Sequence, residues 1–96
     1  MGRATREKPA RLAEKLLQIR LALGLSQTGM LENLGISEKG YRHYISDFEN
    51  GKREPSLLVL LAYSKLTRLS INVLVDDELD LPKHLPTTGR ASRKRN

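Results

Sequence analysis

The amino-acid sequence predicts an all-α protein with five helices. Apolar residues recur at helical spacing, and each candidate helix has a serine directly before it or a glycine directly after it. No segment shows the alternation of apolar and polar residues that is typical of a half-buried strand. A chain of 96 residues with 39% hydrophobic residues suffices for one compact domain, and a second domain does not fit.

The first two helices are expected over residues 9–23 and after Ser26. A proline suits the first turn of a helix, and Gly24 suits the residue that ends one. One apolar stripe predicts the core side of the first helix: Leu12, Leu16, Ile19 and Leu23. Ser26 is the expected N-cap of the second helix, which should end at Leu34 before Gly35.

Three further helices complete the predicted domain. The third is expected around residues 39–49, with apolar anchors at Tyr44, Ile45 and Phe48. The fourth and fifth are expected as LLVLLAYSKLT after Ser56 and INVLV after Ser70, because serine is a preferred N-cap.

The positive charge lies at the two ends of the chain. The net charge is +6, to which residues 1–11 contribute +3 and residues 87–96 contribute +4, so the body is near neutral. Basic arms on a neutral body suit polyanion binding, because neutralised phosphates release condensed counterions. RNA, acidic lipid and simple solubility remain alternatives for such arms.

We expect a basic N-terminal arm over residues 1–8, a helical domain over residues 9–80 and a flexible basic tail over residues 81–96. The chain has no cysteine and two histidines, so we expect no disulfide, metal or cofactor. No stretch has the apolar length of a signal peptide or a membrane span. These features predict a cytoplasmic, nucleoid-associated protein that makes no membrane contact.

An ordered set of residues is more informative than any single motif. It comprises Ile19-Arg20, Gly24-Leu25-Ser26-Gln27, Leu34-Gly35-Ile36-Ser37 and Ile45-Ser46-Asp47-Phe48-Glu49-Asn50-Gly51-Lys52-Arg53-Glu54-Pro55-Ser56, followed by Leu60-Leu61. Over residues 12–75 the set resembles the Xre-type helix-turn-helix family of lambda-like repressors and Cro proteins, and residues 73–86 resemble short bacterial transcriptional regulators within it. The resemblance implies a lambda-repressor-like domain that binds double-stranded DNA in a sequence-specific way, without enzymatic activity.

The resemblance also implies which residues meet the bases. Counted back from Glu49, the base-reading face falls on Arg42, His43, Ser46 and Asp47. Arginine can pair with guanine through two hydrogen bonds, whereas aspartate can accept from the cytosine amino group. Arg42 is therefore the strongest candidate for a base contact. A phosphate clamp or a solvated charge is the alternative for this residue.

DNA-backbone contacts are implied for five residues: Gln27, Tyr44, Asn50, Lys52 and Arg53. Gln27 starts the second helix, where the amide side chain lies beside unpaired main-chain N–H groups and can reach a phosphate. A solvent-exposed helix start is the alternative. Lys52 and Arg53 should add affinity without specificity. For Tyr44, stacking on a sugar and packing on the domain both remain open.

The resemblance implies a structural ion pair between Arg20 and Glu49. The chain departs from the family pattern at three places. About four extra residues lie between Gly35 and Glu49, Leu31 occupies a position that is usually small, and Gly29 removes the usual capping-box partner of the second helix. Transfer of individual roles is therefore weakest within residues 36–48.

Apolar residues away from the core stripes predict self-association. Leu17 and Leu21 lie opposite the core stripe of the first helix, and the fourth helix has a second apolar side: Leu58, Val59, Ala62 and Leu66. We expect a homodimer formed by the fourth and fifth helices. The alternative is that residues 79–85 fold back and cover one of these faces.

The sequence fits several possible functions to different degrees. A transcriptional repressor that occupies its operator fits the pattern best, with arm residues such as Arg3, Arg6 and Arg90–Arg95 adding nonspecific DNA affinity or solubility. An antitoxin of the same fold, whose leucines bind a toxin, is the alternative. An enzyme is disfavoured because His43 and Asp47 lack an accompanying nucleophile motif. A general RNA-binding protein does not fit the neutral body.

Overall fold

The computed structural model describes residues 9–36 and 43–86. Within these ranges all the regular elements are helices, which confirms the predicted class. The five helices are α1 (Leu12–Leu23), α2 (Gln27–Leu34), α3 (Tyr44–Asn50), α4 (Leu57–Thr67) and α5 (Ile71–Val75). None of the helices in the described ranges is long and apolar enough to cross a membrane.

Serine side chains start three of the helices, as the sequence predicted. The hydroxyl groups of Ser26, Ser56 and Ser70 accept hydrogen bonds from the backbone amides of the third residue after each. The donor–acceptor distances are 2.9, 3.2 and 3.4 Å. Each bond satisfies one of the amides that a helix leaves unpaired at its N-terminus.

The start of α1 differs from the prediction. The helix was expected from about Pro9 but begins at Leu12. A distant carboxylate caps the preceding turn, because Asp77 accepts hydrogen bonds from the amides of Ala10 and Arg11 at 2.9 and 3.0 Å. These bonds lower the pKa of the Asp77 carboxyl. The beginning of α1 is therefore determined by a contact with the segment after α5.

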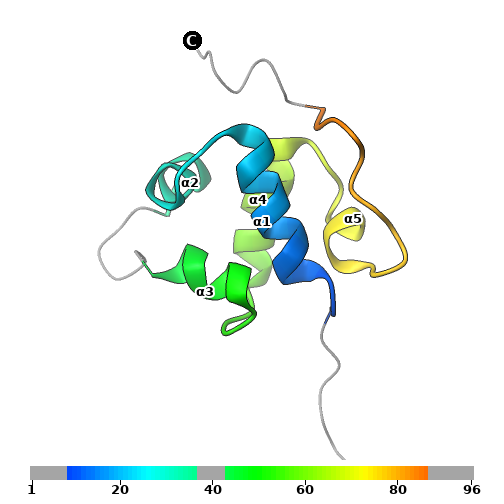
Figure 1. Cartoon of the computed structure of the whole chain (residues 1–96), viewed down its shortest axis with the longest axis horizontal. Helices are drawn as coiled ribbons and strands as arrows, with labels where there is room; N and C mark the ends of the chain where they lie inside the picture. Colours follow the sequence, from blue (N-terminus) through cyan, green and yellow to red (C-terminus); the bar gives the residue numbers. More distant parts are fainter. Residues whose placement is uncertain (1–8, 37–42, 87–96) are drawn as a thin grey trace, which may run out of the picture.

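The helices surround one apolar core. In Figure 1, α1 and α4 overlap at the centre, with α2 and α3 on one side and α5 on the other. Contacts join α1 to α3 and α5, α2 to α3 and α4, and α4 to α5. The predicted stripe of α1 contributes Leu12, Leu16 and Ile19 to this core. Leu31 is buried as well, so the α2 position that is usually small lies inside the core.

The second apolar side predicted for α4, with Leu58, Val59, Ala62 and Leu66, is wrong. Its buried residues are Val59, Leu60, Tyr63 and Thr67, and Ala62 and Leu66 pack partly against the core. Three leucines are exposed instead: Leu57 (71%), Leu58 (75%) and Leu61 (38%). Because α4 is apolar on nearly every side, periodicity could not identify the face that meets α2 and α5.

The packed part of the chain continues beyond residue 80, where the predicted domain ended. Leu85 is buried in the core, and Leu81 packs partly against it. In Figure 1 the segment over residues 81–86, drawn in orange, runs back from α5 toward α1 and α4. This is the fold-back that was the alternative to an exposed apolar face. It leaves the α4 leucines exposed.

Candidate DNA-binding site

Arg20 and Glu49, the residues expected to form a structural pair, join α1 to the end of α3. Arg20 Nε and Nη2 lie 2.7 and 3.0 Å from the two Glu49 carboxylate oxygens. The side chains are 15% and 4% exposed. This hydrogen bonding raises the pKa of the Arg20 guanidinium above its usual value. The removal of either partner would leave the other as a poorly solvated charge.

The Glu49 carboxylate also accepts a hydrogen bond from α2. Gln27 Nε2 donates to Glu49 Oε1 at 3.3 Å, and Arg20 Nη1 donates to the Leu25 carbonyl at 3.0 Å. The N-terminus of α2 is thereby positioned beside the C-terminal half of α3. Because Gln27 Nε2 carries two hydrogens and the residue is exposed, the amide can donate to Glu49 and to a phosphate oxygen together.

The link between Gln27 and Glu49 was not predicted from the sequence. The residues lie 22 positions apart, and neither periodicity nor composition pairs an amide with a carboxylate that is already assigned to Arg20. The expected ion pair between Arg20 and Glu49 was the feature of the sequence that could have led to this link. A carboxylate has two oxygens with several acceptor positions, so a further donor could have been sought beside it.

Tyr63 lies buried near this network. Burial raises the pKa of its phenol well above the usual value, and the negative charge of Glu49 raises it further. Its hydroxyl has no hydrogen-bond partner in the part of the chain that the structure describes. The ring therefore stabilises the core by its apolar surface, and the hydroxyl stays protonated at neutral pH.

α3 presents a polar face to solvent. Ile45 and Phe48 are buried, whereas His43 and Asn50 are exposed and Ser46 is half-buried. Asn50 Nδ2 donates to Ser46 Oγ at 3.3 Å, which joins two of these residues along the helix. The helix begins at Tyr44, later than the expected residue 39.

The expected recognition helix therefore includes residues on which the structure gives no information. Arg42, the strongest candidate for a base contact, lies outside the described residues, as do the arms over residues 1–8 and 87–96. His43 is the N-cap of α3 and makes no capping hydrogen bond through its side chain.

Arg53 contacts two other predicted site residues. Its guanidinium carbon lies 4.1 Å from the centre of the Tyr44 ring, and its Nε lies 3.6 Å from Asp47 Oδ2. The Tyr44 ring packs edge-on against Phe48 at 5.9 Å between centroids. The Tyr44 ring therefore lies between Phe48 and the Arg53 guanidinium.

The loop after α3 turns back onto that helix. The Asp47 carbonyl accepts hydrogen bonds from the amides of Lys52 and Arg53 at 2.9 and 3.2 Å. Gly51 has a φ of 76°, a left-handed conformation that glycine adopts without strain. The turn places the Arg53 side chain next to Tyr44 and Asp47 of α3, and Lys52 is exposed beside it in the chain.

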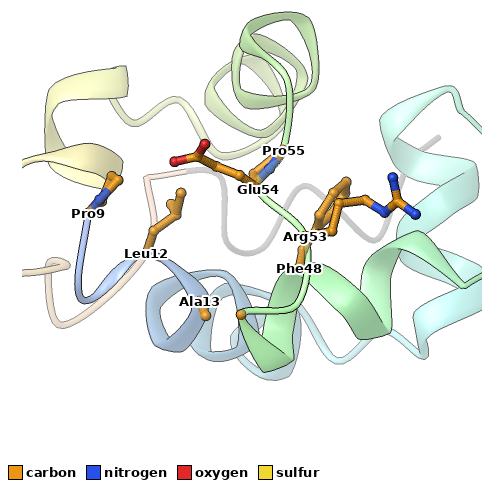
Figure 2. A pocket seen from close by; sticks show the side chains of 8 residues that line it. Pro9, Leu12, Ala13, Phe48, Arg53, Glu54 and Pro55 are labelled. Atoms are coloured by element: carbon orange, nitrogen blue, oxygen red, sulfur yellow. The ribbon is translucent and has the colours of Figure 1, made fainter. Parts of the chain in front are cut away.

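A small pocket of about 60 Å³ lies between the start of α1 and this loop (Figure 2). Sites for small molecules are commonly about 300–1,000 Å³, so this pocket is too small for such a ligand. In Figure 2 the Arg53 side chain extends away from Pro9 and Leu12, whereas the Glu54 carboxylate points toward Pro9. No group of three or more potential metal ligands occurs in the described ranges.

Comparison with known proteins agrees with this geometry. A helix-turn-helix family model matches residues 16–74, more than half of the chain. The match extends from α1 into α5 and includes the whole Arg20–Glu49–Gln27 network. Neither the curated proteins nor the solved structures gave a match to the chain. The chain belongs to the Xre-type, lambda repressor-like helix-turn-helix family of DNA-binding regulators.

Proposed function

We propose that the protein is a transcriptional repressor that binds a specific double-stranded DNA sequence and acts by occupying its operator. The observation that carries this proposal is the bond between Gln27 and Glu49, which positions the start of α2 beside α3. A helix-turn-helix protein needs this relation, because one helix must meet a phosphate while the next enters the major groove. No covalent chemistry is required.

The proposed contacts fall into two groups. Base edges are read from the solvent-facing side of α3 and the residues before it: Arg42, His43 and Ser46. Phosphates are bound at both ends of this surface by Gln27 and by Asn50, Lys52 and Arg53. Base contacts determine which sequence binds, whereas phosphate contacts add affinity for every sequence.

Selection from a random duplex pool tests this division. The wild-type protein should enrich one consensus sequence. Arg42→Ala and His43→Ala should weaken the preference at individual positions by about 1–3 kcal/mol per base pair, whereas Lys52→Ala should weaken the binding of all duplexes alike.

Lys83→Ala is a matched control, because it removes an exposed lysine from the segment that runs along the side of the molecule away from α3 (Figure 1). This variant should bind like the wild type. Selection without any enriched sequence would contradict a repressor, and equal losses on all duplexes for every variant would contradict the proposed base contacts.

The repressor is proposed to act as a homodimer. Leu57, Leu58 and Leu61 form an exposed leucine patch on α4. The segments outside the described ranges are mostly polar or charged, so they offer little apolar surface to cover the patch. A two-fold dimer through α4, extended by α5, would present two α3 helices to a pseudo-palindromic site with half-sites about 34 Å apart.

The dimer predicts that Leu58→Glu converts the protein to a monomer and weakens binding to a palindromic duplex. Leu21→Glu is the control, because Leu21 is also exposed, at 61%, but lies on α1. The mass in solution at micromolar concentration distinguishes the two states. A monomeric wild-type protein would contradict the dimer.

The leucine patch also supports a second candidate, an antitoxin whose α4 binds a toxin. An antitoxin would purify from its natural host with one partner at fixed stoichiometry, and Leu58→Glu would release that partner. A wild-type protein that purifies alone as a dimer favours the repressor.

A further inference from the structure

Three contacts with its own domain position Arg53. Its guanidinium carbon lies over the Tyr44 ring, 4.1 Å from the ring centre, and its Nε lies 3.6 Å from the Asp47 carboxylate. Its backbone amide donates to the Asp47 carbonyl at 3.2 Å. An exposed arginine usually samples many rotamers, so this arrangement limits a side chain that would otherwise be mobile.

The outer edge of the guanidinium remains available. Within the described residues, Arg53 Nη1 and Nη2 make no hydrogen bond, and the side chain is 48% exposed. Two coplanar Nη groups match the spacing of two phosphate oxygens. The contact with the tyrosine ring limits the positions of this fork before DNA arrives, which reduces the entropy lost on binding.

The Asp47 carboxylate opposes the same binding event. It lies close enough to Arg53 to neutralise part of its charge, and its side chain is 27% exposed. A phosphate that approaches Arg53 must compete with this carboxylate and is also repelled by it. The cost does not depend on the base sequence, because phosphates are the same in every duplex.

We propose that Tyr44 and Asp47 act on DNA through Arg53. Tyr44 is a positioning residue that orients the guanidinium toward a phosphate, and Asp47 is an internal counter-charge that lowers the affinity for all duplexes. This inference rests on the proposed DNA binding. It gives both residues roles different from the direct backbone and base contacts that family resemblance implies.

A double-mutant cycle tests the proposal. Duplex affinity is measured for the wild type, Asp47→Asn, Arg53→Ala and the double variant, on the selected sequence and on a random duplex. Asp47→Asn should raise affinity for both duplexes by the same factor, about two- to fivefold, which is the range for a partly exposed ion pair. In the Arg53→Ala background the gain should disappear.

Tyr44 is tested by a matched pair. Tyr44→Phe keeps the ring and should lose less duplex affinity than Tyr44→Leu, which should weaken binding to both duplexes in proteins that contain Arg53 and have no effect in proteins that lack it. Circular dichroism verifies that each variant is folded. If Tyr44→Leu is unfolded, the double-mutant cycle of Asp47 and Arg53 still tests the proposal.

The outcomes separate this inference from the function on which it rests. A wild-type protein that binds no duplex would overturn both. If the wild type binds but Asp47→Asn has the same effect with and without Arg53, the coupling is wrong. A change of preference at one base pair in Asp47→Asn would identify Asp47 as a base contact and overturn its proposed role.

Discussion

Two polar clusters lie at opposite ends of α1, and they use their hydrogen bonds differently. At the C-terminal end, Glu49 accepts from Arg20 and Gln27, and Gln27 keeps one N–H that can donate to an outside ligand. At the N-terminal end, Lys15 is 1% exposed. Its Nζ donates to the carbonyls of Val73, Asp76 and Leu79 at 2.7, 3.0 and 2.7 Å.

This difference distinguishes a polar cluster that stabilises the fold from one that can bind a ligand. An ammonium has three hydrogens, and Lys15 uses all of them on backbone carbonyls, so nothing is left for a ligand. The cluster at Glu49 ends in an exposed amide that still has a donor. Removal of Lys15 should therefore affect folding alone, whereas removal of the Gln27 side chain should affect DNA binding.

The largest expected effect is that of Lys15→Met. This variant keeps most of the side-chain volume but leaves three carbonyls without their donor, which should lower the free energy of unfolding by about 4 kcal/mol. Urea unfolding measures the loss, with Lys83→Met as the exposed control. In an osmolyte that restores the fold, the DNA affinity should equal that of the wild type. A folded Lys15→Met protein with weakened DNA binding would break the distinction between the clusters.

Glu49→Gln should mainly lower the stability of the fold, whereas Gln27→Ala should mainly lower DNA affinity. Glu49→Gln disrupts a buried ion pair and should cost about 3 kcal/mol of unfolding free energy. Gln27→Ala removes an exposed side chain, so stability should change by less than about 0.5 kcal/mol, while DNA affinity falls about tenfold through the lost phosphate contact. Glu32→Ala, at an exposed position on the same helix, is the control. Unchanged affinity in Gln27→Ala would contradict the role given to this residue.

The acid dependence of stability tests the cap of α1. The bonds from Ala10 and Arg11 lower the pKa of Asp77 relative to its unfolded value. The charged carboxylate thus stabilises the fold above the unfolded pKa of about 3.9, and this contribution disappears as the pH falls through the lower folded pKa. The stability difference between wild type and Asp77→Asn should be largest near neutral pH and shrink below about pH 4. Glu78→Gln controls for the loss of a neighbouring carboxylate, and a constant difference at all pH values would contradict the cap.

The smallest expected effect is a gain in stability. Arg68 ends α4 with a φ of 64°, a left-handed conformation in which a side chain is strained. Arg68→Gly should raise the free energy of unfolding by about 0.5 kcal/mol, less than the strain it relieves because glycine also makes the unfolded chain more flexible. Lys65→Gly, in the last turn of α4, should instead destabilise the protein. A loss of stability in Arg68→Gly would show that the arginine side chain stabilises this helix end.

Local chemistry was sufficient to predict much of the fold. Serine caps and terminal glycines identified the ends of helices, since these signals depend on neighbouring backbone groups. The resemblance to the family supplied the pairing of Arg20 with Glu49. The start of α1 could not be predicted in this way, because Asp77 caps it from 66 residues away.

Features determined by tertiary contacts were missed. Lys15 lies on the same helical stripe as Leu12 and Ile19, so its burial was signalled, but its acceptors come from α5 and the segment after it. The exposed face of α4 was misassigned because leucines occupy both sides. The stacking of Arg53 on Tyr44 depends on the turn at Gly51 and was likewise not apparent from the sequence.

The central claim is that DNA binds where α2 and α3 meet and not at the Lys15 cluster. Amide chemical shifts measured by NMR during titration with the selected duplex test it most directly. Large changes in amide chemical shift are expected at Gln27, along α3 and over residues 50–53, with small changes in α5 and residues 76–86. Changes centred on α5 and residues 76–86, with α3 unaffected, would contradict it.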